Sequence, residues 1–177
     1  AIFTDYLGKA YPFFKDTVGQ GTTVSWPASS TLSGKGNEGV AANVGRVKNS
    51  IGYVEFAFAK KNNLAYVQLQ NAAGKFVMPE EKSFSAAAAG VEWSKFPGMA
   101  TFITNAPGAA SWPITGATFI VVYKNASDKA KTDEVLKFFE YGFKDGKDMA
   151  LSLDYVPMPQ DTVNFINSSV WSQVTRK

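Results

Sequence analysis

The chain has 177 residues, which is enough for one ordinary domain or for two small lobes. Hydrophobic residues make up 45% and aromatic residues 14%, so the sequence can build a substantial core and is not expected to be disordered. The 18 basic and 15 acidic residues leave a net charge of only +3, which is too small and too dispersed to indicate a nucleic-acid partner.

Two residue types are absent, and their absence excludes several kinds of site. The sequence has no histidine, which removes the commonest general base and the commonest transition-metal ligand. It has no cysteine, so disulfides and thiolate chemistry are excluded. Histidine-dependent nucleophile systems and histidine-bearing zinc sites are therefore impossible. We expect no enzymatic activity, no cofactor and no metal site.

The first part of the chain shows alternating helix and strand patterns. Apolar residues repeat every three or four positions near the start, which predicts an amphipathic helix. Asn37 is a suitable N-cap for a later helix, because its side-chain oxygen can accept from backbone N–H groups. In chain order, the expected elements are a helix over 3–14, a strand at 24–26, a helix over 37–47, a strand at 51–54 and a helix from 56 to about 61.

A hairpin and a further helix are predicted in the middle of the chain. Alternating apolar and polar residues predict a strand over 65–69. Turn-forming residues at 71–74 then lead to a return strand at 76–77. A helix is expected over 83–89, and residues 90–111 are rich in loop signals.

The last part of the chain begins with segment 118–123, which is nearly all apolar and β-prone. This composition is typical of a central strand covered on both faces. Helices are expected over 132–143 and 148–153, and a last helix has an apolar stripe formed by Val163, Ile166, Val170 and Val174. Strands that alternate with helices indicate an α/β fold with a mostly parallel sheet.

A glycine-rich loop in the first part has the spacing of a dinucleotide-binding motif. Gly34, Gly36 and Gly39 fit the pattern G-x-G-x-x-G. That pattern requires a strand directly before it and an acidic residue about 20 positions later. Glu55 lies at a suitable distance, but Pro27 ends the preceding strand and a polar run follows it. A nucleotide-dependent enzyme therefore remains the weakest of the functional hypotheses.

The same loop is part of a longer pattern. Residues 34–44 are Gly-Lys-Gly-Asn-Glu-Gly-Val-Ala-Ala-Asn-Val, and residues 51–66 are Ile-Gly-Tyr-Val-Glu-Phe-Ala-Phe-Ala-Lys-Lys-Asn-Asn-Leu-Ala-Tyr. Further motifs, in order, are Phe3-Thr4-Asp5-Tyr6-Leu7, Val24-Ser25-Trp26-Pro27, Trp112-Pro113-Ile114-Thr115, Glu134-Val135-Leu136-Lys137-Phe138-Phe139 and Leu153-Asp154-Tyr155. With these motifs the chain resembles, over nearly its whole length, the C-terminal half of the periplasmic phosphate-binding proteins of bacterial ABC transporters, the PstS family.

The resemblance implies a fold and a division into lobes. The fold would be the C-terminal half of a type II-like clamshell with mixed, mostly parallel sheets. Residues 1–112 would form most of one lobe, without its N-terminal part, and residues 113–177 would contribute the C-terminal part of the other. Pro113 suits such a crossing, because it fixes φ and donates no backbone hydrogen bond. The residues alone leave open that the Trp-Pro pair only starts the next strand.

The resemblance also implies where phosphate would be held. The family's gripping run, an arginine followed by serine-glycine-threonine, would lie just upstream of the Phe-Thr pair at positions 3–4. We therefore expect this chain to be a fragment that lacks the main ligand residues. What remains is the start of the first helix, where the backbone N–H groups of Ile2, Phe3 and Thr4 and the helix dipole favour an anion.

Two further groups of residues are candidates for the cleft or hinge. The loop of Ser33, Gly34, Gly36 and Asn37 opens a helix and could form an anion-binding nest. Ordinary capping is the preferred interpretation of this loop. The second group consists of Trp112, Pro113 and Thr115, at the expected crossing between lobes.

The leading hypothesis is the phosphate-binding component of an ABC phosphate importer, located in the periplasm, secreted or on the cell surface. Its expected partners are inorganic phosphate, held together with the missing N-terminal half, and the permease subunits. We also expect exposed apolar surface, covered by a companion N-terminal fragment or by self-association. The chain alone should bind phosphate weakly or not at all. The alternative is a structural or adhesive module on the same scaffold, without a role in transport.

Overall fold

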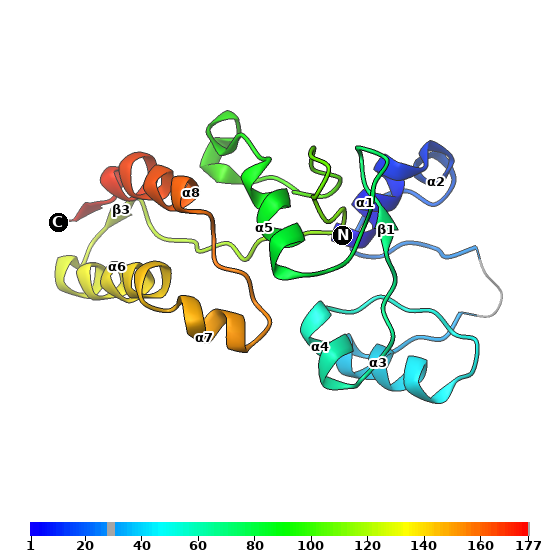
Figure 1. The fold of residues 1–177 in the computed structure, drawn as a ribbon. Helices are drawn as coiled ribbons and strands as arrows, with labels where there is room; N and C mark the ends of the chain where they lie inside the picture. Colours follow the sequence, from blue (N-terminus) through cyan, green and yellow to red (C-terminus); the bar gives the residue numbers. More distant parts are fainter. Residues whose placement is uncertain (28–30, 177) are drawn as a thin grey trace.

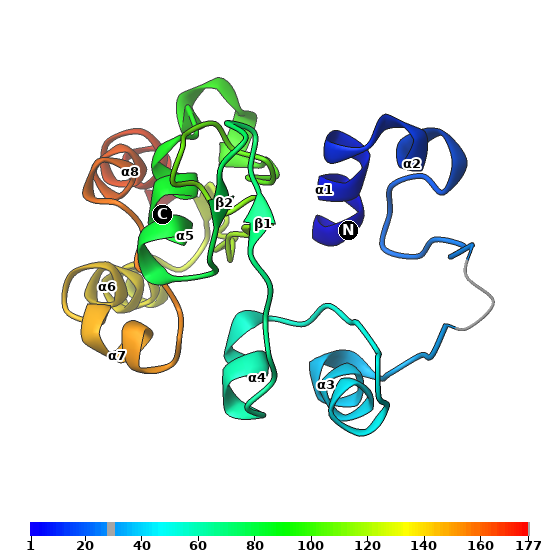
Figure 2. The same ribbon diagram turned by 45° about the vertical axis from the view of Figure 1, so that its right-hand side comes forward.

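The computed structural model describes residues 1–27 and 31–176. Its helices fall into groups along the molecule (Figure 1). Helices α6, α7 and α8 gather at one end, α1 to α4 lie at the other, and α5 lies between them. Figure 2 shows the same separation after rotation, with the β1–β2 hairpin beside α5. The N-terminus lies near the middle of the molecule and the C-terminus at the end formed by α6 to α8 (Figure 1).

Helices account for most of the regular structure. The α-helices are α1 (Ile2–Ala10), α2 (Pro12–Thr17), α3 (Gly36–Arg46), α4 (Phe56–Lys61), α5 (Glu81–Ala89), α6 (Lys129–Lys144), α7 (Lys147–Ser152) and α8 (Gln160–Phe165). Short 3₁₀ turns occur at Trp93–Lys95, Pro97–Met99 and Trp171–Gln173. A π-helical turn at Ile166–Val170 follows α8 directly.

Strands are few and short in the described part of the chain. An antiparallel hairpin pairs β1 (Leu69–Gln70) with β2 (Phe76–Val77). A parallel pair joins β3 (Asn125–Ala126) to β4 (Thr175–Arg176). The expected mixed, mostly parallel sheet is therefore not confirmed, since the described residues form only two separate sheets of two strands each.

The predicted helices are largely confirmed, with two differences in the first part of the chain. The single helix expected over 3–14 is broken at Tyr11, which is extended with φ −140° and ψ 96°. Pro12 causes the break, because a residue that precedes proline is pushed out of the helical region. The prediction that Asn37 caps its helix is wrong. Lys35 is the N-cap of α3, and the Asn37 side chain accepts a hydrogen bond from Glu55 N instead, at 2.9 Å.

The helices of the last part also match the prediction, except at the chain end. The α6 helix starts earlier than expected because the Asp128 side chain caps it, accepting from Lys131 N at 3.0 Å. The last apolar stripe was expected to lie on one continuous helix. Instead α8 ends at Phe165 and the π-helical turn follows, so the stripe loses its register.

The strand predictions were mostly wrong. No strand is assigned at 24–26, 51–54 or 118–123, and the strand expected over 65–69 is reduced to β1. Segment 118–123 differs most, since it was expected to be covered on both faces. Val121 is 91% exposed and Tyr123 is 85% exposed. A strand needs neighbours that accept and donate along its backbone, and the described residues place none beside this segment.

The best-buried region is an irregular segment at residues 103–115. Its buried members are Ile103, Thr104, Ala106, Ser111, Trp112, Pro113 and Thr115. Backbone bonds anchor it to itself and to α5: Asn105 N donates to Pro113 O at 2.8 Å, and Trp112 N donates to Ser83 O at 3.0 Å. The chain therefore packs around a loop rather than around a sheet.

Asn71, in the hairpin turn, holds this buried segment in place. Its side-chain Nδ2 lies within 3.0–3.2 Å of the carbonyl oxygens of Gly108, Ala109 and Ser111. Its Oδ1 accepts from Ala73 N at 3.1 Å and Lys75 N at 3.0 Å. One buried amide thus bonds to backbone groups from two separate loops, among them the carbonyl of the buried Ser111.

Because burial differs so much along the chain, substitutions at exposed and buried positions should change the free energy of unfolding by very different amounts. Val121→Lys should change the free energy of unfolding by no more than about 0.5 kcal/mol, because the side chain already faces solvent. Ile103→Ala should lower it by about 2–5 kcal/mol, because Ile103 is only 2% exposed and its removal leaves a cavity. Urea unfolding of both variants measures the difference. A loss of several kcal/mol for Val121→Lys would mean that segment 118–123 is covered in solution.

Candidate functional site

The start of α1 provides the backbone donors that the sequence predicted. The first intrahelical hydrogen bond runs from Asp5 N to Ala1 O at 2.9 Å. The N–H groups of Ile2, Phe3 and Thr4 precede this bond, so the helix itself gives them no acceptor. The helix dipole adds a partial positive charge at the same end. These are the elements of half an anion site.

The side chains at this helix start are engaged in packing. Thr4 is buried, and its hydroxyl lies 2.9 Å from both Ala1 O and Gly21 O. The same hydroxyl accepts from Gly21 N at 3.2 Å. The Phe3 ring stacks on the Tyr53 ring, with centroids 4.1 Å apart. The predicted residues therefore offer a ligand backbone N–H groups but no free polar side chain.

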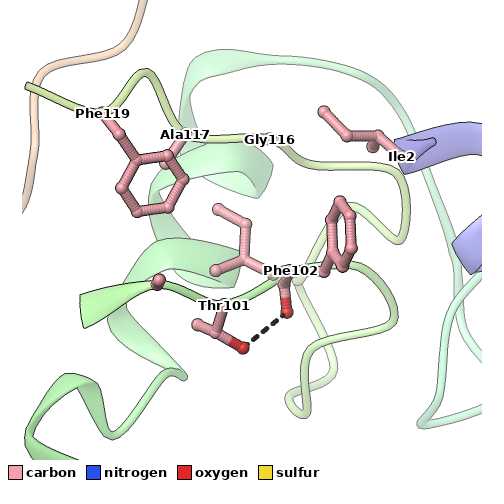
Figure 3. Close-up of a pocket in the computed structure, with 8 residues that line it drawn as sticks. Ile2, Thr101, Phe102, Gly116, Ala117 and Phe119 are labelled. Atoms are coloured by element: carbon pink, nitrogen blue, oxygen red, sulfur yellow. Dashed lines mark hydrogen bonds between the residues drawn. The ribbon is translucent and has the colours of Figure 1, made fainter. Parts of the chain in front are cut away.

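An apolar cavity lies beside the helix start (Figure 3). Its volume is about 320 Å³, and it is lined by Ile2, Ala100, Thr101, Phe102, Ile103, Gly116, Ala117 and Phe119. Ile2 packs closely on Gly116, since a Cβ built at Gly116 would lie 2.6 Å from Ile2 Cδ1. None of the described residues that line this cavity is charged, so they do not match the charge of a phosphate ion.

A buried polar cluster on α1 was not predicted. The Asp5 carboxylate accepts hydrogen bonds from Gln20 Nε2 and Thr104 Oγ1 and pairs with Lys9 Nζ at 2.8 Å. Lys9 Nζ also donates to Thr104 Oγ1 at 2.8 Å. Tyr6 lies on the same helix, and its burial raises the pKa of its phenol. The cluster fixes α1 to the buried segment, and the i, i+4 spacing of Asp5 and Lys9 was the available sequence signal.

The glycine-rich loop closes on itself. A Cβ on Gly34 would lie 2.5 Å from Gly39 C and from Val40 N, so the loop backbone packs directly against the first turn of α3. Gly36 has φ +66°, which favours glycine. The Ser33 carbonyl accepts from Asn43 Nδ2 at 3.2 Å. The loop therefore packs on the helix through its backbone, whereas the side-chain capping that we preferred for it is not observed. The strand that a dinucleotide motif needs is not assigned before it among the described residues.

The third candidate group is part of the buried segment. Trp112 and Thr115 are buried, and the Pro113 side chain is fully enclosed. Thr115 Oγ1 donates to Trp112 O at 2.9 Å, so its hydroxyl serves the local turn. The structure brings this group near the start of α1, through the contact of Gly116 with Ile2. No hydrogen bond between described residues joins the Ser33–Asn37 loop to that place.

Comparison with known proteins gives one consistent result. The chain is 48% identical over 172 residues to the phosphate-binding protein PstS of Pasteurella multocida, covering 97% of this chain and 49% of that protein. It is 48% identical over 166 residues to PstS of Haemophilus influenzae, covering 94% of this chain and 49% of the relative. The resemblance to the PstS family is confirmed.

A more distant relative bears the same name. The chain is 31% identical over 175 residues to PstS of Methanocaldococcus jannaschii, covering 91% of this chain and 45% of that protein. The chain therefore spans about half the length of the curated relatives it matches. No family model matches the chain. The similarity supports an α/β fold of the periplasmic-binding-protein class, and the relatives are named as binding proteins.

Two further features bear on the class of site. Among residues 1–27 and 31–176, no three carboxylate side chains gather in a way that could hold a metal ion. Within the same residues, no helix combines the length and apolar character that a membrane crossing demands.

A matched pair of glycine substitutions tests the packing role of the loop. Gly34→Ala should destabilise the chain by about 1–3 kcal/mol, because the new Cβ would overlap backbone atoms of Gly39 and Val40. Gly142→Ala, in open space within α6, should stabilise it by about 0.5–1 kcal/mol. Thermal unfolding of both variants is the measurement. An equal, small effect at both sites would contradict the packing role.

The Asp5 cluster predicts a second stability difference. Asp5→Ala should lower the free energy of unfolding by about 1–3 kcal/mol, because Gln20 and Thr104 lose a buried charged acceptor. Asp16→Ala is the control, since Asp16 is exposed on α2 and its removal should change stability by less than about 0.5 kcal/mol. Urea unfolding compares the two. Similar small losses would mean that the Asp5 contacts do not stabilise the fold.

Proposed function

We propose that this chain forms the C-terminal part of a phosphate receptor that serves an ABC phosphate importer. The supporting observation is the 48% identity to PstS of Pasteurella multocida over 97% of the chain. In this proposal the protein captures phosphate and presents it to the permease subunits, without making or breaking a bond. Its location would be the periplasm, or the cell surface if the protein is secreted.

The geometry supports a phosphate site to which the two halves of the receptor contribute different groups. The described residues supply a helix start with backbone donors, while the neighbouring side chains are apolar or already hydrogen-bonded. A dehydrated phosphate ion needs a partner for each of its oxygens, because an unpaired buried group costs about 1–3 kcal/mol. We therefore propose that the main ligand residues come from the half of the receptor that this chain does not cover.

We further propose that residues 1–112 and 113–177 belong to two different lobes. The pairs of helices and strands that pack most extensively all lie within one of these parts, such as α1 with α2 and α6 with α7. The proposed crossing at Trp112 and Pro113 lies near the end of the buried segment 103–115. The residues that follow this segment are largely exposed.

The exposed apolar residues support a need for a partner. Phe119, Ile120, Val121 and Tyr123 are all exposed, and Phe138 on α6 is 68% exposed. Large apolar side chains that are exposed together often mark an interaction site. The N-terminal half of the receptor is the partner that we propose. Self-association is the alternative, and analytical ultracentrifugation of the chain distinguishes it.

Isothermal titration calorimetry with inorganic phosphate tests the proposal. The chain alone should give no measurable heat of binding. A chimera in which the uncovered part of the Pasteurella multocida protein precedes Ala1 should bind phosphate and should not bind sulfate.

Two outcomes would contradict this. Tight phosphate binding by the chain alone would mean that the ligand residues lie within these 177 residues. A folded chimera that binds no phosphate would favour the structural or adhesive module.

A further inference from the structure

Two polar contacts join the proposed lobes at a distance from the crossing at Trp112 and Pro113. Lys60, at the end of α4, forms an ion pair with Asp154. One residue further along, interaction with the Glu55 carboxylate at the start of the same helix raises the pKa of Tyr155. The segment after α7 thus turns toward α4 (Figure 1). Both ends of one short helix are linked to one turn of the other part.

The two contacts lie at a cavity between the parts. The cavity has a volume of about 390 Å³ and lies between α4, the start of α5 and residues 151–156. Lys60 is the only basic side chain among its described lining residues, whereas Glu80, Glu81 and Asp154 contribute carboxylates. The Lys60 ammonium also lies 5.7 Å from the centre of the Phe56 ring, which favours a cation there.

We propose that Lys60 and Asp154 form an interlobe latch that sets the relative orientation of residues 1–112 and 113–177. Lys60 is its central residue, because it pairs with Asp154 and is the only basic side chain among the described residues that line the cavity. This inference rests on the proposed division into lobes and not on phosphate binding, so it can fail or hold independently of the proposed ligand.

The exposure of the latch suits a reversible contact. The Lys60 side chain is 46% exposed and the Asp154 side chain 27% exposed. Ion pairs at this level of exposure contribute little stability, so the latch can break without unfolding either part. No helix or strand pair across the two parts packs extensively among the described residues, so side-chain contacts such as this ion pair can contribute to the orientation.

The contact between Tyr155 and Glu55 has its own signature. The hydrogen bond to Glu55, with its negative charge, raises the pKa of Tyr155 above its ordinary value. Glu55→Gln should lower the Tyr155 pKa toward that ordinary value, which NMR of ¹³Cζ-labelled tyrosine measures. The contact is complete while the phenol is neutral and is lost as the pH rises through its raised pKa.

Spin-label distances test the latch. The chain has no cysteine, so cysteines at Lys48 and Lys144 give one label in each part. Double electron–electron resonance should show one narrow distance distribution in the otherwise unchanged chain. Lys60→Met should shift or broaden this distribution beyond its original width, because Asp154 loses its ion-pair partner in the other part. Lys60→Arg keeps the charge and should leave it unchanged.

Charge exchange and a matched control separate the latch from a general loss of structure. Lys60→Asp should disturb the distribution, and adding Asp154→Lys should restore it. Lys137→Met removes a lysine from an exposed ion pair with Glu134 inside α6 and should have no effect. An unchanged distribution in Lys60→Met combined with Tyr155→Phe would overturn the proposal. So would failure of the charge exchange to restore it, or an equal disturbance by Lys137→Met.

Discussion

The structure depends on the burial of an irregular backbone segment, residues 103–115, among side chains that can satisfy its polar groups. A buried loop is costly because its N–H and C=O groups have no ladder to join. Here Asn71 supplies an amide within reach of three carbonyl oxygens, and Asp5 holds Thr104 from the other side. The hairpin, α1 and α5 are therefore held together through one loop, and the segments on either side of it are much less constrained.

This constraint explains why most helices could be predicted from the sequence, whereas β2 was the one strand predicted with its observed bounds in the described residues. A helix satisfies its own backbone, so the stripe of α6 and the cap of Asp128 suffice to place it. A strand depends on a neighbour, which no local pattern reveals. Segment 118–123 has the composition of a covered strand and yet lies exposed, because the described chain offers it no partner. The composition is typical of a covered environment that the described residues do not provide.

In the candidate site, too, local features were predicted from the sequence, whereas contacts between distant residues were not. The motif at the chain start led to the backbone donors of α1, because a helix start is a local feature. The Asp5 cluster was missed, since Gln20 and Thr104 are distant from it in the sequence and only folding brings them together. The glycine pattern at Gly34 and Gly36 fitted a nucleotide motif, but its spacing serves close backbone packing on α3. The spacing of the glycines indicates where the backbone can be approached closely. The surrounding contacts decide whether a ligand or another part of the chain packs there.

The distribution of polar contacts bears on how such a chain can work in a receptor. Around Asn71 and Asp5 the polar contacts are buried and interlinked, so the elements that they join should move together. Between the two proposed lobes, the ion pair of Lys60 with Asp154 is partly exposed. Exposed pairs exchange readily with water, whereas buried networks do not. One part can move relative to the other about the crossing only if the contacts are strong within each part and weak between the two parts.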